Sequence, residues 1–269
     1  MRDCFDREIN YLRISVTDRC NLRCRYCMPD TDTGLEARTN KRRDLLSFEE
    51  IAKVVSVAAT LGLHKIRLTG GEPLMRKGIV DLVTMIRKVP KVRYLAMTTN
   101  GVLLKKYAAG LKKGGLDSVN ISLDTLNAER YRRLTTNGDI SQVFIGIDAA
   151  AGEGLVINLN MVVLPDTAPG EIEQMKEFCQ ARAIELRLIN HYSLVKKKRQ
   201  HYKFDRPPDC SQCNRIRLLA DGSLKPCLHN DKEIKVDMAN IGDSLRQTIS
   251  EKPKNGWVCT NRGMVEIGG

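Results

Sequence analysis

Three cysteines lie within eight positions near the start of this 269-residue chain, in "DRCNLRCRYCMPD": Cys20, Cys24 and Cys27. Thiolates at such spacing bind zinc or iron–sulfur clusters, but a structural zinc site normally takes four protein ligands. Only three thiols are local here, and the segment before them reads as a strand. The triad therefore favours a [4Fe–4S] cluster with one iron left open for another molecule.

A second triad with C-x2-C-x13-C spacing lies in the last quarter of the chain: Cys210, Cys213 and Cys227. Arg215 and Arg217 follow its C-x2-C pair at alternate positions, so both can face one anion if the segment is a strand. Two interpretations stay open from these residues alone. The triad could hold a second cluster, or nearby His229 could complete a Cys3His zinc site.

Elements of alternating type must position these residues. The sequence predicts strands at 11–17, 65–70, 94–100, 118–124, 156–163 and 184–190, and helices at 47–62, 78–88, 103–113, 127–152 and 170–182. Ser47 and Glu50 form a capping-box pattern at the start of the first helix. Repeated strand–helix steps are typical of an α/β domain with a parallel sheet, here predicted to be a closed or partly closed barrel.

The alternating pattern ends at residue 192. Residues 193–210 are basic and contain a Pro pair, which suits an exposed connector. Beyond them, "RIRLLADGSLKPCL" predicts a β-hairpin that turns at Asp221–Gly222. We therefore expect two domains, a barrel over 1–192 and a small C-terminal module over 193–269.

Each predicted strand has one apolar and one polar face. Because helices cover the outside of a parallel barrel, the apolar face must point outward and the polar face must line the lumen. Arg13, Lys65 and Arg67 then point inward, where buried cations are costly without an anion. A bound anion would offset that cost. The alternative is that Arg13 and Arg67 lie at the rim in salt bridges with Asp124 and Glu185.

Composition limits the class of protein and partner. The chain has 42% hydrophobic and 28% charged residues, no apolar run near the about 18 residues of a membrane span, and no signal-peptide core, so we expect a cytoplasmic protein. Nine cysteines, an odd number, are more typical of metal ligands and free thiols than of disulfides. A net charge of +12 with only 5% aromatic residues favours an acidic small molecule; we expect no nucleic acid and no membrane partner.

The first triad and a second motif together resemble the radical S-adenosylmethionine (radical SAM) superfamily. The matching residues are C-x3-C-x-Tyr-C, with Tyr26 before the last cysteine, and "LTGGEP" at 68–73 after the second strand. The resemblance implies that Cys20, Cys24 and Cys27 hold a [4Fe–4S] cluster whose open iron binds SAM. It also implies that SAM contacts Tyr26, Gly71, Ser122 and Tyr192.

The second triad, the segment "CNRIRLLADGSLKPCL" and the terminal "MVEIGG" resemble the GTP 3′,8-cyclase (MoaA) family of molybdenum cofactor biosynthesis, from about residue 9 to the end. This resemblance implies a partial (β/α)6 TIM-like radical SAM barrel and a second [4Fe–4S] cluster on Cys210, Cys213 and Cys227. It further implies that GTP is contacted by Arg13, Lys65, Arg67, Thr98, Arg215, Arg217, Gly268 and Gly269. Of these residues, Arg217 and Arg215 are also implied to be catalytic.

The activity implied by this family is the first step of molybdenum cofactor biosynthesis. A reduced cluster cleaves SAM to methionine and a 5′-deoxyadenosyl radical, which takes hydrogen from C3′ of GTP. The C3′ radical then adds to guanine C8, giving 3′,8-cyclo-7,8-dihydroguanosine 5′-triphosphate. The implied partners are GTP, SAM, a reducing electron donor and the downstream cyclic pyranopterin monophosphate synthase, and a homodimer is a further expectation.

The sequence also departs from the family. Asn158 replaces a GTP-contacting lysine expected on the fifth strand, Tyr192 replaces a SAM-contacting methionine, and the connector to Cys210 is short. Two alternatives therefore stay open: a related radical SAM enzyme acting on another nucleotide or a peptide, and a zinc-stabilised nucleic-acid-binding protein. Cys179 is expected in the core, and Cys4 and Cys259 are unassigned thiols.

Overall fold

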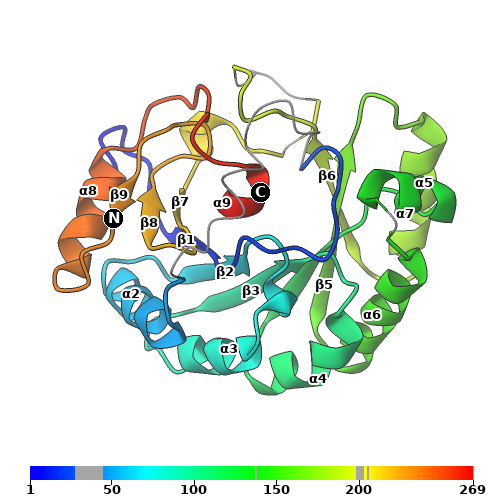
Figure 1. Cartoon of the computed structure of the whole chain (residues 1–269), viewed down its shortest axis with the longest axis horizontal. Coiled ribbons are helices and arrows are strands. Elements are labelled where there is room, and N and C mark those ends of the chain that lie inside the picture. Colours follow the sequence, from blue (N-terminus) through cyan, green and yellow to red (C-terminus); the bar gives the residue numbers. More distant parts are fainter. Residues whose placement is uncertain (28–44, 137, 198–202, 205, 269) are drawn as a thin grey trace.

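The computed structural model describes residues 1–27, 45–136, 138–197, 203–204 and 206–268. Within these residues the chain forms a nine-stranded sheet in the order β6-β5-β4-β3-β2-β1-β7-β8-β9. Figure 1 shows that the sheet curves into an open barrel. Its strands are β1 Tyr11–Ser15, β2 Lys65–Thr69, β3 Tyr94–Thr99, β4 Ser118–Ser122, β5 Val156–Val163, β6 Glu185–Asn190, β7 Arg215–Leu218, β8 Ser223–Lys225 and β9 Ile234–Lys235.

Helices cover the convex side of this sheet, while the C-terminal helix α9 lies inside its curve (Figure 1). The outer helices are α2 Phe48–Thr60, α3 Ile79–Arg87, α4 Leu104–Lys113, α5 Ala128–Thr135, α6 Ile140–Gly152 and α7 Pro169–Gln180. The C-terminal part adds α8 Ile241–Ser250 and α9 Met264–Ile267, and single 3-10 turns occur at Pro73–Met75 and Cys210–Gln212. The predicted capping box on α2 is confirmed, since Ser47 and Glu50 exchange both hydrogen bonds.

The prediction of one helical segment over 127–152 is wrong. The chain breaks it into α5 and α6 because Thr136 adopts a left-handed conformation, with φ of 55°, at the end of α5. Asp139 then caps α6 by accepting a hydrogen bond from the backbone N–H of Ser141. The Asp139 side chain bonds to local backbone, which favours a new helix start, whereas the Thr136 hydroxyl donates to the distant Arg23 carbonyl oxygen at 2.9 Å.

The two faces of the strands are sorted as expected. Leu12, Ile14, Ile66 and Leu68 are fully buried in the hydrophobic core beneath the outer helices. The parallel α/β barrel fold predicted from the alternating elements is confirmed by the parallel pairing of β1 through β6.

The C-terminal segment extends the same sheet. β7 pairs in parallel with β1, and β8 and β9 follow in antiparallel order. The predicted hairpin at Asp221–Gly222 is confirmed, and Gly222 supplies the left-handed φ of 83° that the turn needs. The domain boundary near residue 193 stays a prediction, because the sheet runs without a break from the barrel into the hairpin.

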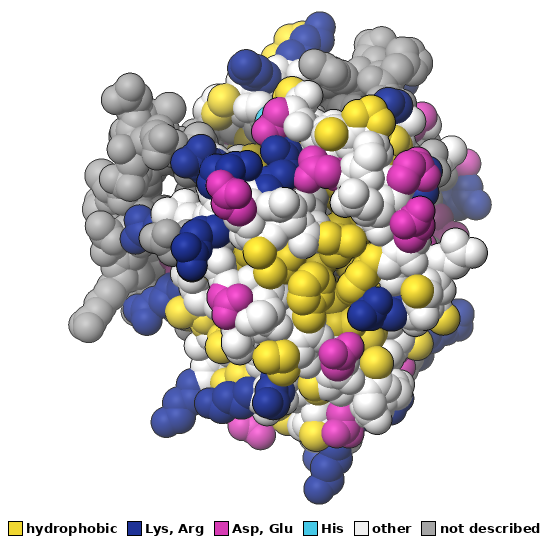
Figure 2. Space-filling model, turned by 90° about the vertical axis from the view of Figure 1, so that its right-hand side faces the viewer, with side chains coloured by type: hydrophobic (Ala, Val, Ile, Leu, Met, Phe, Trp, Pro, Cys, Tyr) yellow, Lys and Arg dark blue, Asp and Glu magenta, His cyan; other side chains and the backbone are white. Residues whose placement is uncertain are grey.

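The surface is mixed in charge on the face shown in Figure 2. Basic and acidic side chains alternate there around a central apolar group, and they do not form a single basic surface on this side. Much of the excess positive charge that concerns function lies inside the barrel instead, as described below. In the part of the chain that the structure describes, no helix has the length and apolar character needed to cross a membrane.

Candidate active site

Two rows of cationic side chains cross the inner face of the barrel. The parallel register places Arg13 of β1 beside Arg67 of β2 on one side and beside Arg217 of β7 on the other. Two residues earlier, Tyr11 of β1 lies between Lys65 and Arg215 in the same way. Side chains at i and i+2 share a face of a strand, so both rows point into the barrel.

Tyr11 organises the second row, although sequence analysis did not single it out. Its hydroxyl accepts a hydrogen bond from Arg67 Nε, and its ring lies 5.2 Å from Lys65 Nζ and 5.8 Å from the Arg215 guanidinium carbon. The Tyr94 ring flanks the same lysine at 5.3 Å. Burial alone would raise the pKa of Tyr11, but the surrounding arginines lower it to about 8. An aromatic residue on an otherwise polar strand face was the available signal.

The first row meets the C-terminal tail. Arg217 Nη1 donates to the carbonyl oxygen of Gly268 at 2.7 Å, and Arg13 Nη2 donates to the same oxygen at 3.2 Å. Both arginines are more than nine-tenths buried. Burial and the neighbouring Arg217 lower the pKa of Arg13 to about 9, and burial also lowers the pKa of Arg217. Such a site is strongly electropositive, and a polyanion would relieve the repulsion.

The rim salt bridges considered as an alternative do not form. Glu185 pairs with Arg187 at 2.6 Å. Asp124 accepts hydrogen bonds from the Tyr26 hydroxyl at 2.6 Å and from the Val162 backbone N–H at 2.8 Å. Both carboxylates therefore have partners other than Arg13 and Arg67.

The adjoining strands add polar groups. Thr98 Oγ1 accepts a hydrogen bond from Arg67 Nη1 at 3.3 Å, which connects β3 with the first row. Asn158, which replaces an expected lysine, is buried and donates to Asn120 Oδ1 at 3.3 Å. This amide pair fills the place where a further cation was expected, without a charge.

The first cysteine triad lies on the loop that leaves β1. Cys20 Sγ accepts hydrogen bonds from the Leu22 backbone N–H at 3.4 Å and from Asn100 Nδ2 at 3.9 Å. Burial, then the Asp124 carboxylate and the neighbouring cysteines, raise the pKa of Cys24. Burial and the neighbouring Cys20 raise the pKa of Cys27 to about 12. Three partly buried thiols that oppose one another's ionisation fit a centre whose irons supply positive charge.

The "GGEP" loop packs directly against the triad loop. A Cβ atom on Gly71 would lie 2.2 Å from the Arg19 carbonyl oxygen, so only glycine permits this approach. Glu72 is buried and accepts hydrogen bonds from Leu74 N at 3.0 Å, Thr99 Oγ1 at 2.7 Å and Asn100 N at 2.7 Å. It thereby fixes the loop to the end of β3.

Burial raises the pKa of Glu72 from 4.5 to about 7. The folded protein then holds a proton that the unfolded chain releases, so this group stabilises the fold fully below pH 4.5. Its contribution is lost as pH rises through about 7, by at most about 1.4 kcal/mol per pH unit. We expect Glu72→Gln to reduce the fall in unfolding free energy between about pH 5 and pH 7.5, measured by urea denaturation. Glu177→Gln, on the exposed side of α7, should keep the wild-type slope.

The second triad lines one cavity with Arg215, Arg217, His229 and Lys252, among other residues. Lys252 is almost fully buried, and its Nζ donates to Cys213 Sγ at 3.3 Å, Arg215 O at 2.8 Å and Pro226 O at 2.9 Å. Burial would raise the pKa of Cys213, but Lys252 and Arg215 lower it to about 7. Sequence analysis missed this lysine, which is distant in the chain and carries no motif.

The zinc interpretation of this triad requires thiols and His229 to converge on a single ion. Among the described residues, no three His, Cys, Asp or Glu side chains are arranged around one ion. A [4Fe–4S] cluster does not need such convergence, because each thiolate binds a different iron. The His229 ring instead lies 5.2 Å from the Tyr192 ring in an edge arrangement.

The remaining predicted site residues lie between the triads. Tyr26, on the first-triad loop, is held by Asp124, and its ring lies 6.4 Å from that of His191. Ser122 ends β4 opposite Asn160 of β5. The Tyr192 ring contacts the ring of His229, which lines the cavity of the second triad. This contact connects the end of the barrel with the C-terminal part. Gly269 lies outside the described residues.

The fold and these loops define the radical SAM class. A family model described as the radical SAM superfamily matches residues 14–179. Among solved structures, Streptococcus suis SuiB bound to its precursor peptide superposes with a TM-score of 0.71 at 16% identity, over 93% of this chain and 66% of that one. anSMEcpe with bound S-adenosylmethionine superposes with a TM-score of 0.66 at 18% identity, over 91% and 81%. These likenesses concern the fold.

Curated relatives narrow the class. The GTP 3′,8-cyclase of Alkaliphilus metalliredigens is 37% identical over 100% of both chains, and that of Thermodesulfovibrio yellowstonii is 38% identical over the same share. The alignments are longer than this chain, so the relatives contain segments that it lacks. The chain belongs to the radical SAM superfamily and, within it, to the GTP 3′,8-cyclase family. Its cofactors accordingly include SAM and a [4Fe–4S] cluster.

Proposed function

We propose that the protein converts GTP to 3′,8-cyclo-7,8-dihydroguanosine 5′-triphosphate. Family membership supports the reaction, and the two cationic rows formed by Arg67–Arg13–Arg217 and Lys65–Tyr11–Arg215 support the substrate. A nucleoside triphosphate is a polyanion, and guanidinium groups bind phosphate oxygens through paired N–H donors. These rows, of which the first is buried and the second partly buried, are the observation on which the proposal depends.

On the SAM side, Cys20, Cys24 and Cys27 would hold the first cluster. When bound, the cluster and SAM supply a 5′-deoxyadenosyl radical. Gly71 lets the "GGEP" backbone approach closely, and the Tyr26–Asp124 hydrogen bond orders the triad loop. Tyr26, Gly71, Ser122 and Tyr192 are our proposed SAM contacts.

On the GTP side, Cys210, Cys213 and Cys227 would hold a second [4Fe–4S] cluster. The proposed GTP contacts are Arg13, Lys65, Arg67, Thr98, Arg215, Arg217, Gly268 and Gly269. Arg217 and Arg215 are the proposed catalytic residues. Both lie on β7, each belongs to one of the two cationic rows, and both line the cavity of the second triad. Holding C3′ and C8 of one nucleotide in reach of each other favours ring closure by proximity.

The wider setting follows from the reaction. The protein would need a reducing electron donor, and its product would pass to cyclic pyranopterin monophosphate synthase. A cytoplasmic location and a homodimer stay predictions.

The direct test is anaerobic incubation of the reconstituted protein with GTP, SAM and dithionite, followed by mass analysis. We expect a cyclised nucleotide and GTP-dependent 5′-deoxyadenosine. SAM cleavage that GTP does not stimulate would indicate another substrate, such as a different nucleotide or a peptide. A colourless protein that contains zinc and lacks sulfide would contradict any radical SAM function.

Lys252 offers a test of the second cluster. Its buried ammonium group donates to Cys213 Sγ, and its charge helps to lower the pKa of Cys213 to about 7 against the effect of burial. Burial raises the pKa of Cys227, and the charge of Lys252 opposes that rise. We expect Lys252→Met to lower the iron and sulfide retained by the purified protein, and to lower the reduction potential of what remains, because hydrogen bonds to the sulfurs set that potential. Lys254→Met, at an exposed position two residues away, is the matched control. Equal iron content and potential in both variants would contradict a cluster at this triad.

A further inference from the structure

The C-terminal tail, residues 257–268, delivers a backbone carbonyl into the cationic site. It enters the barrel through α9 and places the Gly268 oxygen between Arg217 and Arg13, at 2.7 and 3.2 Å. The tail ends in α9, and in an α-helix a shift by one residue moves a group about 1.5 Å along the axis and about 100° around it. A shift of the tail by one residue would therefore remove the carbonyl from both arginines, and something must fix its register.

Apolar packing does not fix this register. Ile267 is 1% exposed and packs in a small cluster with Leu194, Leu219 and Cys259. This contact favours burial of the tail, but hydrophobic contacts are non-directional. α9 itself has only four residues, too few to be stable in isolation.

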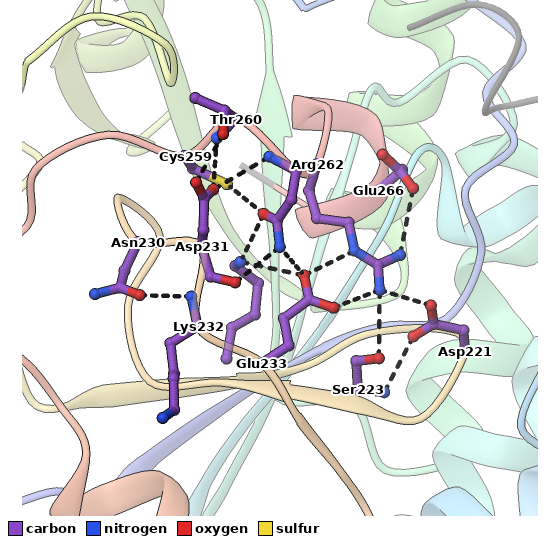
Figure 3. Close-up of polar contacts among 12 residues, drawn as sticks. Asp221, Ser223, Asn230, Asp231, Lys232, Glu233, Cys259, Thr260, Arg262 and Glu266 are labelled. Carbon is purple, nitrogen blue, oxygen red and sulfur yellow. Dashed lines mark hydrogen bonds and ion pairs between the residues drawn. The ribbon is translucent and has the colours of Figure 1, made fainter.

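Arg262 supplies directional contacts at the base of the tail. Its Nε donates to Glu233 Oε1 at 2.8 Å and its Nη2 to Glu233 Oε2 at 2.6 Å, a paired arrangement (Figure 3). Nη2 also lies 2.8 Å from Asp221 Oδ2, and Nη1 lies 3.4 Å from Glu266 Oε1. One planar guanidinium thus connects β8–β9, the hairpin turn and α9, which fixes both position and orientation.

The loop that receives Arg262 is itself held firmly. Fully buried Lys225 donates to Glu233 Oε1 at 3.2 Å and to Asn261 Oδ1 at 3.3 Å. Asp231 accepts hydrogen bonds from the Thr260 backbone N–H at 2.6 Å and from its hydroxyl at 2.7 Å. Figure 3 shows the contacts between Asp231 and Thr260 in the same cluster as Arg262 and Glu233. The tail therefore meets a fixed surface.

Charge makes Arg262 difficult to replace. Although burial opposes its charge, Glu233 and Asp221 raise the pKa of its guanidinium. Three carboxylates face it, and Glu266 is 4% exposed. Loss of the arginine would remove the cation that all three carboxylates share, and removing one partner of a buried ion pair is strongly destabilising.

We propose that Arg262 is a positioning residue for the cyclisation, which holds the tail in the register that places the Gly268 carbonyl between Arg13 and Arg217. It acts through the tail and does not touch the substrate. The inference rests on the proposed function in one respect, because its kinetic test measures formation of the cyclised nucleotide.

The test compares the reconstituted wild-type enzyme with Arg262→Gln and with Arg246→Gln, whose exposed side chain pairs with Asp243 on α8. In Arg262→Gln we expect backbone hydrogen exchange of residues 263–268 to accelerate at least about tenfold, while exchange in β1 through β4 stays unchanged. We expect kcat for the cyclised product to fall about 100-fold, as for a group displaced by an ångström or more, with KM for SAM unchanged. Arg246→Gln should match the wild type in every measurement.

Glu233→Gln provides a second, independent variant, since it leaves Arg262 in place and removes its paired acceptor. The double variant Arg262→Gln/Glu233→Gln should be little worse than either single one, because both remove the same contact. Unchanged tail exchange in Arg262→Gln, additive effects in the double variant, or a released tail with full turnover would each overturn the proposal. If the wild type forms no cyclised nucleotide from GTP, the proposed function fails, whereas tail exchange still decides whether Arg262 holds the tail.

Discussion

Replacing Cys213 by serine is expected to abolish formation of the cyclised nucleotide while reductive cleavage of SAM continues. Cys213 belongs to the second triad, which lines one cavity with Arg215 and Arg217, whereas we assign the SAM chemistry to the first triad. Replacing Cys24 by serine should instead abolish both reactions, because SAM cleavage requires the first cluster. We expect each loss to exceed about 1,000-fold, as for removal of a component that has no substitute.

The measurement combines the iron and sulfide content of anaerobically purified protein with mass analysis of 5′-deoxyadenosine and of the nucleotide product. If both triads hold clusters as proposed, each variant should lose about half of the wild-type iron. Cys4→Ser is the matched control, since Cys4 is exposed and lies outside both triads. Turnover by Cys213→Ser at the wild-type rate would contradict a role of the second triad in the reaction.

Replacing Gly268 by alanine is expected to displace the tail and to lower product formation about 100-fold. A Cβ atom there would lie 2.5 Å from Thr69 Cγ2 and 2.9 Å from the Gly70 backbone nitrogen. The residue also has φ of 67°, in the left-handed region, which costs alanine about 1 kcal/mol relative to glycine. Neither backbone nor the packed threonine can move aside cheaply.

Gly263→Ala is the control for this prediction. Gly263 lies in the same tail, but its φ is −84° and a Cβ atom would meet nothing closer than Glu266 Oε2 at 3.6 Å. Rates of product formation and tail hydrogen exchange should stay at wild-type values in Gly263→Ala and change together in Gly268→Ala. If Gly268→Ala forms product as fast as the wild type, the contact of the Gly268 carbonyl with Arg13 and Arg217 plays no part in turnover.

Local patterns determined the class of the fold. Period-two alternation sorted each strand into a buried apolar face and an inner polar face, because helices can cover only the outer side of a parallel barrel. This placed Arg13 and Arg67 inside the barrel, where the structure has them. The prediction of one helix over 127–152 overlooked the Asn-Gly pair at 137–138, which is a strong turn signal, and therefore joined α5 and α6 wrongly.

The motifs of the two cysteine triads, together with the basic character of the strands, also determined the kind of chemistry. Their spacing is local in the chain, so a sequence displays it directly. The residues that support them do not share this property. Lys252 reaches Cys213 from 39 positions away, and Tyr11 acquires its cationic neighbours from β2 and β7.

Only the tertiary structure decided how the C-terminal tail is held. The sequence displays a terminal Gly-Gly, but nothing in it connects Arg262 with Glu233, Asp221 and Glu266, which lie on a hairpin and a short helix. Such contacts depend on the register of β7 against β1 and on the path of the chain after α8. Sequence patterns report which face of an element is buried, whereas charged groups from separate elements meet only where the whole sheet brings them together.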